Sequence, residues 1–320
     1  MLTYLLFIVG FILLIKGADL LVNGSSSLAK KFHIPEIVIG LTIVSFGTSL
    51  PELIVNILAA LQGSTDIGLG TIIGSNISNI ALVLGFTAII LPLAVKSDTA
   101  WKEIPFSILA TIIMMVVVND HFFNPAIASM ISRIDGLIFL IFFGLFVSYT
   151  INIFVKHKNL DISQEQKMHR SGLTIFFMIV AGLIALFYGG QWVVNGAVKI
   201  AQLFGISEFI IAATIIAVGT SLPELVTSIV AAYKKNLDLA VGNIIGSNIF
   251  NILFVLGITA VIKPIATPTL INIDILYLIG LSIILFAFLF IGKKKELERW
   301  QGVSLLIIYV GYVVFLIMRG

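Results

Sequence analysis

Two glutamates stand in the same six-residue pattern at two places in the chain. The letters GTSLPE occupy 47–52 and 219–224, so Glu52 and Glu224 each follow a Thr-Ser pair and a Pro inside a long apolar stretch. A carboxylate deep in an apolar segment is costly unless it faces a partner or a watery cavity. Together the two carboxylates supply the charge that balances a divalent cation. We therefore interpret them as the centre of a cation site.

A second pair of polar patterns supplies further oxygen atoms. GSNISN at 74–79 and GSNIFN at 246–251 place a Ser and an Asn four residues apart, which puts both side chains on one helix face. Asn76 and Asn248 lie on a different face, and we expect them to cap or cross-link helices. Besides the two glutamates, the candidate side-chain ligands are Thr48, Ser49, Ser75, Asn79, Thr220, Ser221, Ser247 and Asn251.

The prolines of the two GTSLPE patterns predict breaks in their helices. A proline inside a helix removes one backbone hydrogen bond and clashes with the preceding turn, and the Gly-Thr-Ser before it adds to the break. We expect two half-helices joined by a short unwound segment in each copy. Carbonyls released there, such as those of Ser45 and Ala217, complete the candidate ligand set.

All of these donors are oxygens, which selects hard cations such as Ca²⁺, Mg²⁺ or Na⁺ over zinc or copper. The chain has four His, which lie in loops or at expected helix ends, and no Cys. We expect no prosthetic group. An intramembrane enzyme with Ser49 or Ser221 as nucleophile would lack a general base other than the glutamates, so we do not expect an enzyme.

The composition predicts the surroundings of this site. Of 320 residues, 59% are hydrophobic and 11% are charged, against about 25% charged in a typical soluble domain. Apolar runs of roughly 20 residues, long enough to span a bilayer, recur along the chain. Segments of ~10 alternating residues, as in a β-barrel, are absent. A net charge of +3 gives nucleic-acid binding no support. No obligate protein partner is indicated.

We predict an all-α integral membrane protein embedded in the lipid bilayer. The expected ten transmembrane helices cover 1–29, 36–61, 67–93, 103–119, 135–155, 172–201, 208–232, 239–262, 270–291 and 302–318.

The chain contains an internal repeat with an offset of 172 residues. GTIIGSNISNI at 70–80 aligns with GNIIGSNIFNI at 242–252, and the two GTSLPE copies align without a gap. Each unit contains five expected helices, an odd number, so the second enters the membrane from the opposite side. The predicted organisation is two inverted-topology five-helix repeats, 1–155 and 172–320, joined by a polar linker at 156–171. Helices 2, 3, 7 and 8 are expected to be broken.

Most of the Lys and Arg residues fall in loops on one side of the expected membrane. By the positive-inside rule that side is cytoplasmic. The prediction is a multi-pass cell-membrane protein with both termini extracellular and the 156–171 loop cytoplasmic.

At GTSLPE and GSNxxN the chain resembles the cation/calcium antiporter superfamily, specifically prokaryotic sodium/calcium exchangers, whose two α-repeats look like these segments. The resemblance implies ion sites formed by helices two, three, seven and eight, with the ligands falling on the candidate residues above. It also implies exchange of several Na⁺ for one Ca²⁺ across the membrane, with alternating access provided by helices one and six sliding across the core.

Departures from the family pattern leave the coupling ion open. Potassium-dependent relatives, and some prokaryotic sodium/calcium members, carry Asp where this chain has Asn251. Asn at both 79 and 251 limits the charge of the site to −2, which argues against K⁺ dependence. The proton-coupled branch typically has Asn before PE in the first motif, where this chain has Thr-Ser-Leu. The hydroxyl pair favours Na⁺, with a Ca²⁺/H⁺ antiporter as the same-fold alternative and a cation channel as the alternative from another class.

Overall fold

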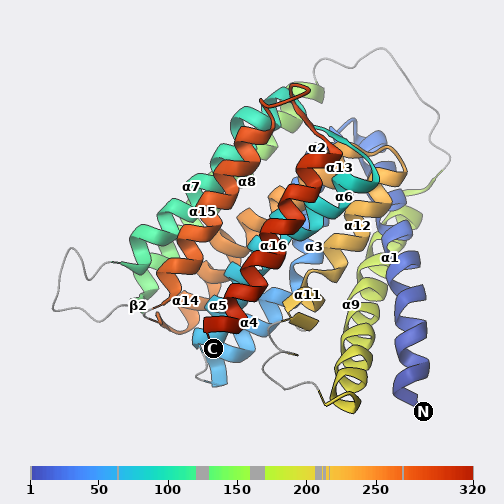
Figure 1. The fold of residues 1–320 in the computed structure, drawn as a ribbon. Coiled ribbons are helices and arrows are strands. Elements are labelled where there is room, and N and C mark those ends of the chain that lie inside the picture. Colours follow the sequence, from blue (N-terminus) through green and yellow to red (C-terminus); the bar gives the residue numbers. More distant parts are fainter. Residues whose placement is uncertain are drawn as a thin grey trace.

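The computed structural model describes residues 2–62, 65–119, 130–158, 170–205, 211, 214–215, 217–268 and 270–319. Within these residues the chain is a bundle of long helices with four strands of two residues each (Figure 1). The linker expected at 156–171 lies largely outside the described residues. The helices and strands are α1 Leu2–Phe32, α2 Glu36–Ile39, η1 Gly40–Val44, α3 Ser45–Thr48, α4 Leu50–Gln62, α5 Thr65–Ser78, η2 Asn79–Leu84, α6 Gly85–Ile90, β1 Leu93–Ala94, η3 Thr99–Glu103, α7 Ile104–Val118, β2 Met130–Ile131, α8 Arg133–Lys158, α9 Gly172–Leu203, α11 Ala217–Thr220, α12 Leu222–Tyr233, α13 Leu237–Ile249, η6 Phe250–Val255, α14 Leu256–Ile262, β3 Ile265–Ala266, α15 Ile271–Phe288, β4 Glu296–Leu297 and α16 Arg299–Arg319, where η marks a π-helix.

Eight helices in the described part of the chain are long and apolar enough to cross a membrane, and a bent helix pair makes a ninth candidate. These nine correspond to nine of the ten expected spans. The remaining expected span, 208–232, is represented by α11 and the shorter apolar helix α12, because part of 208–216 lies outside the described residues. The all-α membrane architecture is therefore confirmed, and the count of ten stays a prediction.

The break expected at the first GTSLPE is confirmed. The segments Glu36–Thr48 and Leu50–Gln62 meet at an angle of 44°, and Ser49 between them has φ −85° and ψ 5°. The second copy repeats this geometry, since Ser221 between α11 and α12 has φ −88° and ψ 4°.

The breaks expected in the third and eighth helices are wrong. Gly68–Ile90 and Leu237–Ile262 each run as one continuous helix. Each contains a π-helical segment in place of a break, η2 in the first and η6 in the second. These helices carry no Pro, so no backbone donor is missing, and a wider turn is enough to shift the helical phase.

Glycines bring α1 and α9 into backbone contact along their length. A Cβ at Gly10 would lie 2.9 Å from the Gly189 carbonyl oxygen, and a Cβ at Gly17 would lie 2.9 Å from that of Gly182. At the repeat offset of 172, Gly10 aligns with Gly182 and Gly17 with Gly189, so the two contacts are equivalent with the halves exchanged. Small residues of this kind let membrane helices approach closely, so α1 and α9 pack as one pair at the side of the bundle (Figure 1).

The short strands also form equivalent contacts between the two halves. Strand β1 pairs antiparallel with β4, and β3, which aligns with β1 at the offset of 172, pairs antiparallel with β2. Each pairing therefore joins the first half to the second. The beginning of α1 and the end of α16 lie at the same end of the bundle (Figure 1).

Candidate functional site

The two helix breaks place both glutamates at the start of a new helix. Glu52 lies in the first turn of α4 and Glu224 in the first turn of α12. The free N–H groups and the dipole of a helix N-terminus favour negative charge at that position. The Thr-Ser pair that precedes each glutamate lies at the break itself.

Both carboxylates are fully buried. Glu52 is 1% exposed and Glu224 0%, and none of the ion pairs among the described residues involves either one. Glu52 Oε2 and both carboxylate oxygens of Glu224 have no hydrogen-bond partner in the described part of the chain. Burying carboxylate oxygens without partners is costly, and a bound cation or a proton would offset that cost.

Hydroxyl groups link the two halves around these carboxylates. Ser75 Oγ lies 3.3 Å from Glu52 Oε1, to which it donates, and 3.3 Å from Thr220 Oγ1. At the aligned position, Thr48 Oγ1 lies 3.4 Å from Ser247 Oγ. The Glu224 carboxylate has Thr48, Ser49 and Glu52 as its electrostatic neighbours. The site therefore draws on both GTSLPE copies and on both GSNxxN helices.

A symmetric set of oxygen atoms in this region has no hydrogen-bond partner among the described residues. It includes the hydroxyl oxygens of Ser49 and Ser221 and the amide oxygens of Asn79 and Asn251, together with the carboxylate oxygens above. All of these side chains are at most 2% exposed. Buried polar atoms are normally hydrogen-bonded, so paired orphan oxygens beside two carboxylates fit a site built for cations.

The two backbone carbonyls expected as ligands, those of Ser45 and Ala217, differ from the side-chain ligands in how far the structure supports them. The Ser45 carbonyl is not released, because it accepts hydrogen bonds from Ser49 N–H at 3.0 Å and from Thr48 Oγ1 at 3.3 Å. In the second copy, Ser221 N–H donates to the Val218 carbonyl at 3.1 Å, one residue beyond Ala217. The role of the Ala217 carbonyl stays a prediction.

Two buried amides next to the site were missed from the sequence. Asn243 Oδ1 accepts from Thr48 Oγ1 at 3.1 Å, and its Nδ2 donates to Ser228 Oγ at 3.1 Å. Asn56 Nδ2 donates to the Glu52 carbonyl at 2.9 Å, and Asn56 Oδ1 has no partner among the described residues. The signal was spacing, because Asn243 lies one turn before Ser247 and Asn56 one turn after Glu52.

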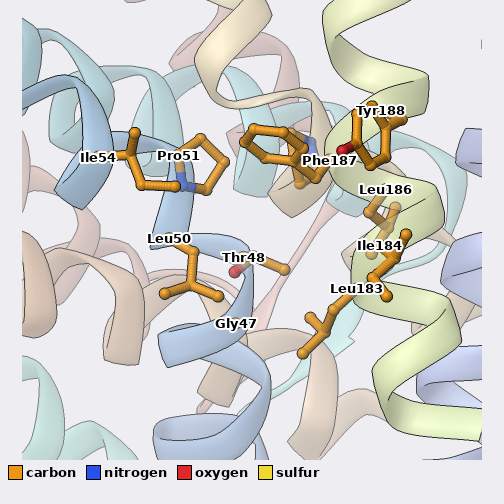
Figure 2. Close-up of a pocket in the computed structure, with 11 residues that line it drawn as sticks. Gly47, Thr48, Leu50, Pro51, Ile54, Leu183, Ile184, Leu186, Phe187 and Tyr188 are labelled. Carbon is orange, nitrogen blue, oxygen red and sulfur yellow. The ribbon is translucent and has the colours of Figure 1, made fainter. Parts of the chain in front are cut away.

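Cavities lie between the first helix break and α9. Figure 2 shows one of about 270 Å³, where Thr48, Leu50 and Pro51 face Leu183 and Phe187. A neighbouring cavity of about 340 Å³ reaches Thr220 and extends past Leu58 and Gln191. Since Thr48 lines the first and Thr220 the second, both adjoin the oxygen-rich region from the side of α9.

Chemically, the site offers carboxylate, hydroxyl and amide oxygens in a closed space. No group of three or more His, Cys, Asp or Glu side chains gathers in the described residues. The charge thus rests on two glutamates and the remaining donors are neutral. Such a set suits Ca²⁺, which takes six to eight oxygen ligands, and also smaller monovalent sites.

Comparison with known proteins gives matches along nearly the whole chain. The model of the family described as "Sodium/calcium exchanger protein" matches residues 2–152 and 174–318. Inner membrane protein YrbG of Escherichia coli is 38% identical over 98% of this chain and 95% of its own. Sodium/calcium exchanger MaX1 of Methanosarcina acetivorans is 29% identical over 98% of each chain.

Among solved structures, the sodium-calcium exchanger NCX_Mj, soaked with Na⁺ and Ca²⁺, matches with a TM-score of 0.80 at 33% identity, covering 98% of both chains. This chain therefore belongs to the sodium/calcium exchanger protein family.

Proposed function

We propose that this protein is a secondary active antiporter that exchanges Na⁺ for Ca²⁺ across the membrane. The observation that carries the proposal is the pair of buried, unpaired glutamates, one from each half, surrounded by orphan hydroxyl and amide oxygens. The relatives named as sodium/calcium exchangers support the choice of ions. The function is transport rather than catalysis, and the ions are cargo rather than cofactors.

In this proposal Ca²⁺ binds between Glu52 and Glu224, since two carboxylates neutralise its charge. Na⁺ binds at the hydroxyl-rich ends of the same cluster, near Thr48 and Thr220. Because the two sets share the carboxylates, Na⁺ and Ca²⁺ compete, which couples their movement in opposite directions. The proposed ligands are Thr48, Ser49, Glu52, Ser75, Asn79, Ala217, Thr220, Ser221, Glu224, Ser247 and Asn251.

The proposed scaffold is a pair of inverted five-helix repeats, 1–155 and 172–320, with ten spans. Three kinds of contact support it, because each recurs with its partners exchanged between halves: the strand pairs, the glycine contacts of α1 with α9, and the hydroxyl contacts Thr48–Ser247 and Ser75–Thr220. An inverted repeat places such exchanged contacts around an axis in the membrane plane.

Alternating access would come from movement of the α1–α9 pair across the rest of the bundle. The cavities that separate α9 from the first helix break support this, since they adjoin the ion ligands on the face that α9 covers (Figure 2). The close glycine contacts between the two helices would let them move as a unit.

The proposed orientation places both termini outside and the 156–171 loop in the cytoplasm. The common position of the termini at one end of the bundle supports an even number of crossings (Figure 1). The chain has no native Cys, so single cysteines report sidedness directly. Lys263→Cys should react with an impermeant maleimide on intact cells and Lys294→Cys only after permeabilisation. The reverse pattern would invert the topology.

The function is tested by ⁴⁵Ca²⁺ uptake into proteoliposomes that hold the purified protein. Vesicles loaded with Na⁺ and diluted into Na⁺-free buffer should take up Ca²⁺, and a pH gradient alone should not drive uptake. Glu52→Gln and Glu224→Gln serve as inactive controls. Uptake that follows the pH gradient and ignores Na⁺ would assign the protein to Ca²⁺/H⁺ exchange, and uptake without counter-transport would indicate a channel.

A further inference from the structure

Four asparagines join the middle helices of the two halves. Asn76 and Asn79 come from the α5–η2 helix, and Asn248 and Asn251 from the α13–η6 helix. Asn76 Nδ2 donates to the Asn248 carbonyl at 3.2 Å, and Asn248 Nδ2 lies 3.5 Å from the Asn76 carbonyl. The predicted cross-linking role of Asn76 and Asn248 is thereby confirmed.

The side-chain oxygens of Asn76 and Asn248 each accept a hydrogen bond from an asparagine side chain of the opposite half. Asn251 Nδ2 donates to Asn76 Oδ1 at 3.0 Å, and Asn79 Nδ2 donates to Asn248 Oδ1 at 3.0 Å. The pattern is crosswise, so an asparagine of one half contacts the candidate ligand of the other. All four side chains are at most 1% exposed.

The backbone carbonyls determine which way every amide points. A carbonyl oxygen can only accept, so Asn76 and Asn248 must turn their NH₂ groups toward each other's backbone. Their oxygens then face Asn251 and Asn79. Those two residues must in turn offer their NH₂ groups, since two amide oxygens in contact would repel. The orientation follows from donors and acceptors alone, without reference to an ion.

These hydrogen bonds also fix where the amide oxygens of Asn79 and Asn251 point. With their NH₂ groups occupied, Asn79 and Asn251 present their oxygens away from the cross-link. Both Oδ1 atoms are buried and have no hydrogen-bond partner among the described residues. They belong to the same orphan set as Ser49, Ser221 and the glutamates. An amide turned the other way would present an NH₂ group, which repels a cation.

We propose that Asn76 and Asn248 are positioning residues that keep the amide oxygens of Asn251 and Asn79 turned toward the transported ions. This inference rests on the proposed function and names residues outside its ligand set. Each acts through the ligand of the opposite half, so the two halves cannot form their sites independently. Loss of an outer partner of this kind typically lowers metal affinity by ~10–100-fold.

A crosswise double-mutant cycle tests this inference. Ca²⁺ dissociation constants are measured by isothermal titration calorimetry on the full-length protein in detergent, for Asn76→Leu, Asn251→Ala, Asn79→Ala and their pairs. Asn76→Leu should raise the dissociation constant about tenfold. It should add no further loss to Asn251→Ala, because it acts through that residue, whereas with Asn79→Ala the two losses should multiply.

The mirror cycle exchanges the partners, so Asn248→Leu should couple to Asn79→Ala and not to Asn251→Ala. A merely structural role would give equal coupling to both ligands, or an unchanged dissociation constant, and either result overturns the inference. If the leucine variants do not yield folded protein, as judged by thermal unfolding, Asn76→Ala and Asn248→Ala carry the same cycles.

If the wild-type protein binds Ca²⁺ but the variants do not show the crosswise coupling, the positioning role is refuted and the proposed antiport is not. Wild-type protein that shows neither Ca²⁺ binding nor Na⁺-driven uptake refutes the proposed function, and the positioning role falls with it.

Discussion

The two halves of this protein bring the same chemical groups to the centre and hold them differently. Ser49 N–H donates to a carbonyl four residues back and Ser221 N–H to one three residues back. Thr48 Oγ1 donates to Asn243, whereas the residue aligned with Asn243 in the first half is Thr71. The ligand residues therefore follow the repeat, whereas the backbone hydrogen bonds at the two breaks and the residue types at 71 and 243 differ between the halves. Repeated ligands let both halves contribute equally to ion binding. Different surroundings allow transport in the two directions across the membrane to differ.

The largest loss of Ca²⁺ affinity should come from the two glutamates, which occupy the same position in each half. Glu52→Gln and Glu224→Gln should each lower Ca²⁺ affinity about 100-fold or more, because each removes half of the charge that balances a buried divalent ion. The double variant should bind no Ca²⁺. Equilibrium ⁴⁵Ca²⁺ binding measures this, with the half-buried Glu298→Gln, far from the site in sequence, as the control. A tenfold difference between the two single variants would break the proposed equivalence.

The next effect concerns Asn243, at a position where the first half has Thr71. Asn243→Leu removes one of the two acceptors of the Thr48 hydroxyl, so its hydrogen turns to the Ser45 carbonyl and its lone pairs change direction. We expect the Na⁺ concentration for half-maximal exchange to rise about five- to tenfold. Ser228→Ala, which removes the partner of Asn243 Nδ2 and leaves Thr48 bonded, should change it less. Equal effects of both variants would show that Asn243 acts only through packing.

A smaller effect concerns the fold rather than the ions. A Cβ at Gly246 would lie 2.6 Å from Ser45 Oγ and 2.9 Å from Leu41 Cα, both in the other half, whereas a Cβ at the exposed Gly311 of α16 has no described atom within 4 Å. Gly246→Ala should therefore destabilise the protein by ~1–3 kcal/mol through overpacking, and Gly311→Ala should be nearly neutral. Thermal unfolding in detergent compares them, and equal losses would mean that the close contact between the halves at Gly246 contributes nothing specific to stability.

The smallest effect concerns an ion pair between α1 and the end of α12. Lys234 forms an ion pair with Asp19 of α1 and donates to Asn23 Oδ1 at 2.7 Å, while the aligned positions are Gln62 and Gln191. Both charged side chains are partly exposed, so the pair should contribute only ~0.2–1 kcal/mol.

Lys234→Gln should accordingly change the uptake rate less than about threefold, and Gln62→Asn should leave it unchanged. Measuring Na⁺-driven Ca²⁺ movement in both directions would sharpen the comparison. An unequal change would assign the ion pair to one conformation, and a loss above tenfold would contradict its minor role.

Much of the site could be predicted from the sequence, because its main features are local. A proline and a carboxylate repeated in register identify the helix breaks, and a spacing of four identifies the Ser and Asn on one face. The error at Ser45 also has a local cause. Pro51 lacks the N–H that would bond to the carbonyl four residues earlier, at Gly47, so the Ser45 carbonyl keeps its partner.

What could not be predicted depends on contacts between halves. Asn243 lies outside the GSNIFN pattern and gains its role only because Thr48 of the other half reaches it. The continuity of the third and eighth helices also depends on packing, since a π-helical segment has no sequence signature as strong as a proline.

The most direct test of the central claim is the number of Ca²⁺ ions bound per chain, measured by equilibrium ⁴⁵Ca²⁺ binding to the purified protein. A site shared between the halves predicts one Ca²⁺ per chain, lost in Glu52→Gln and equally lost in Glu224→Gln. Two Ca²⁺ per chain, with each variant losing only one, would mean that each half binds its own ion and would contradict the account.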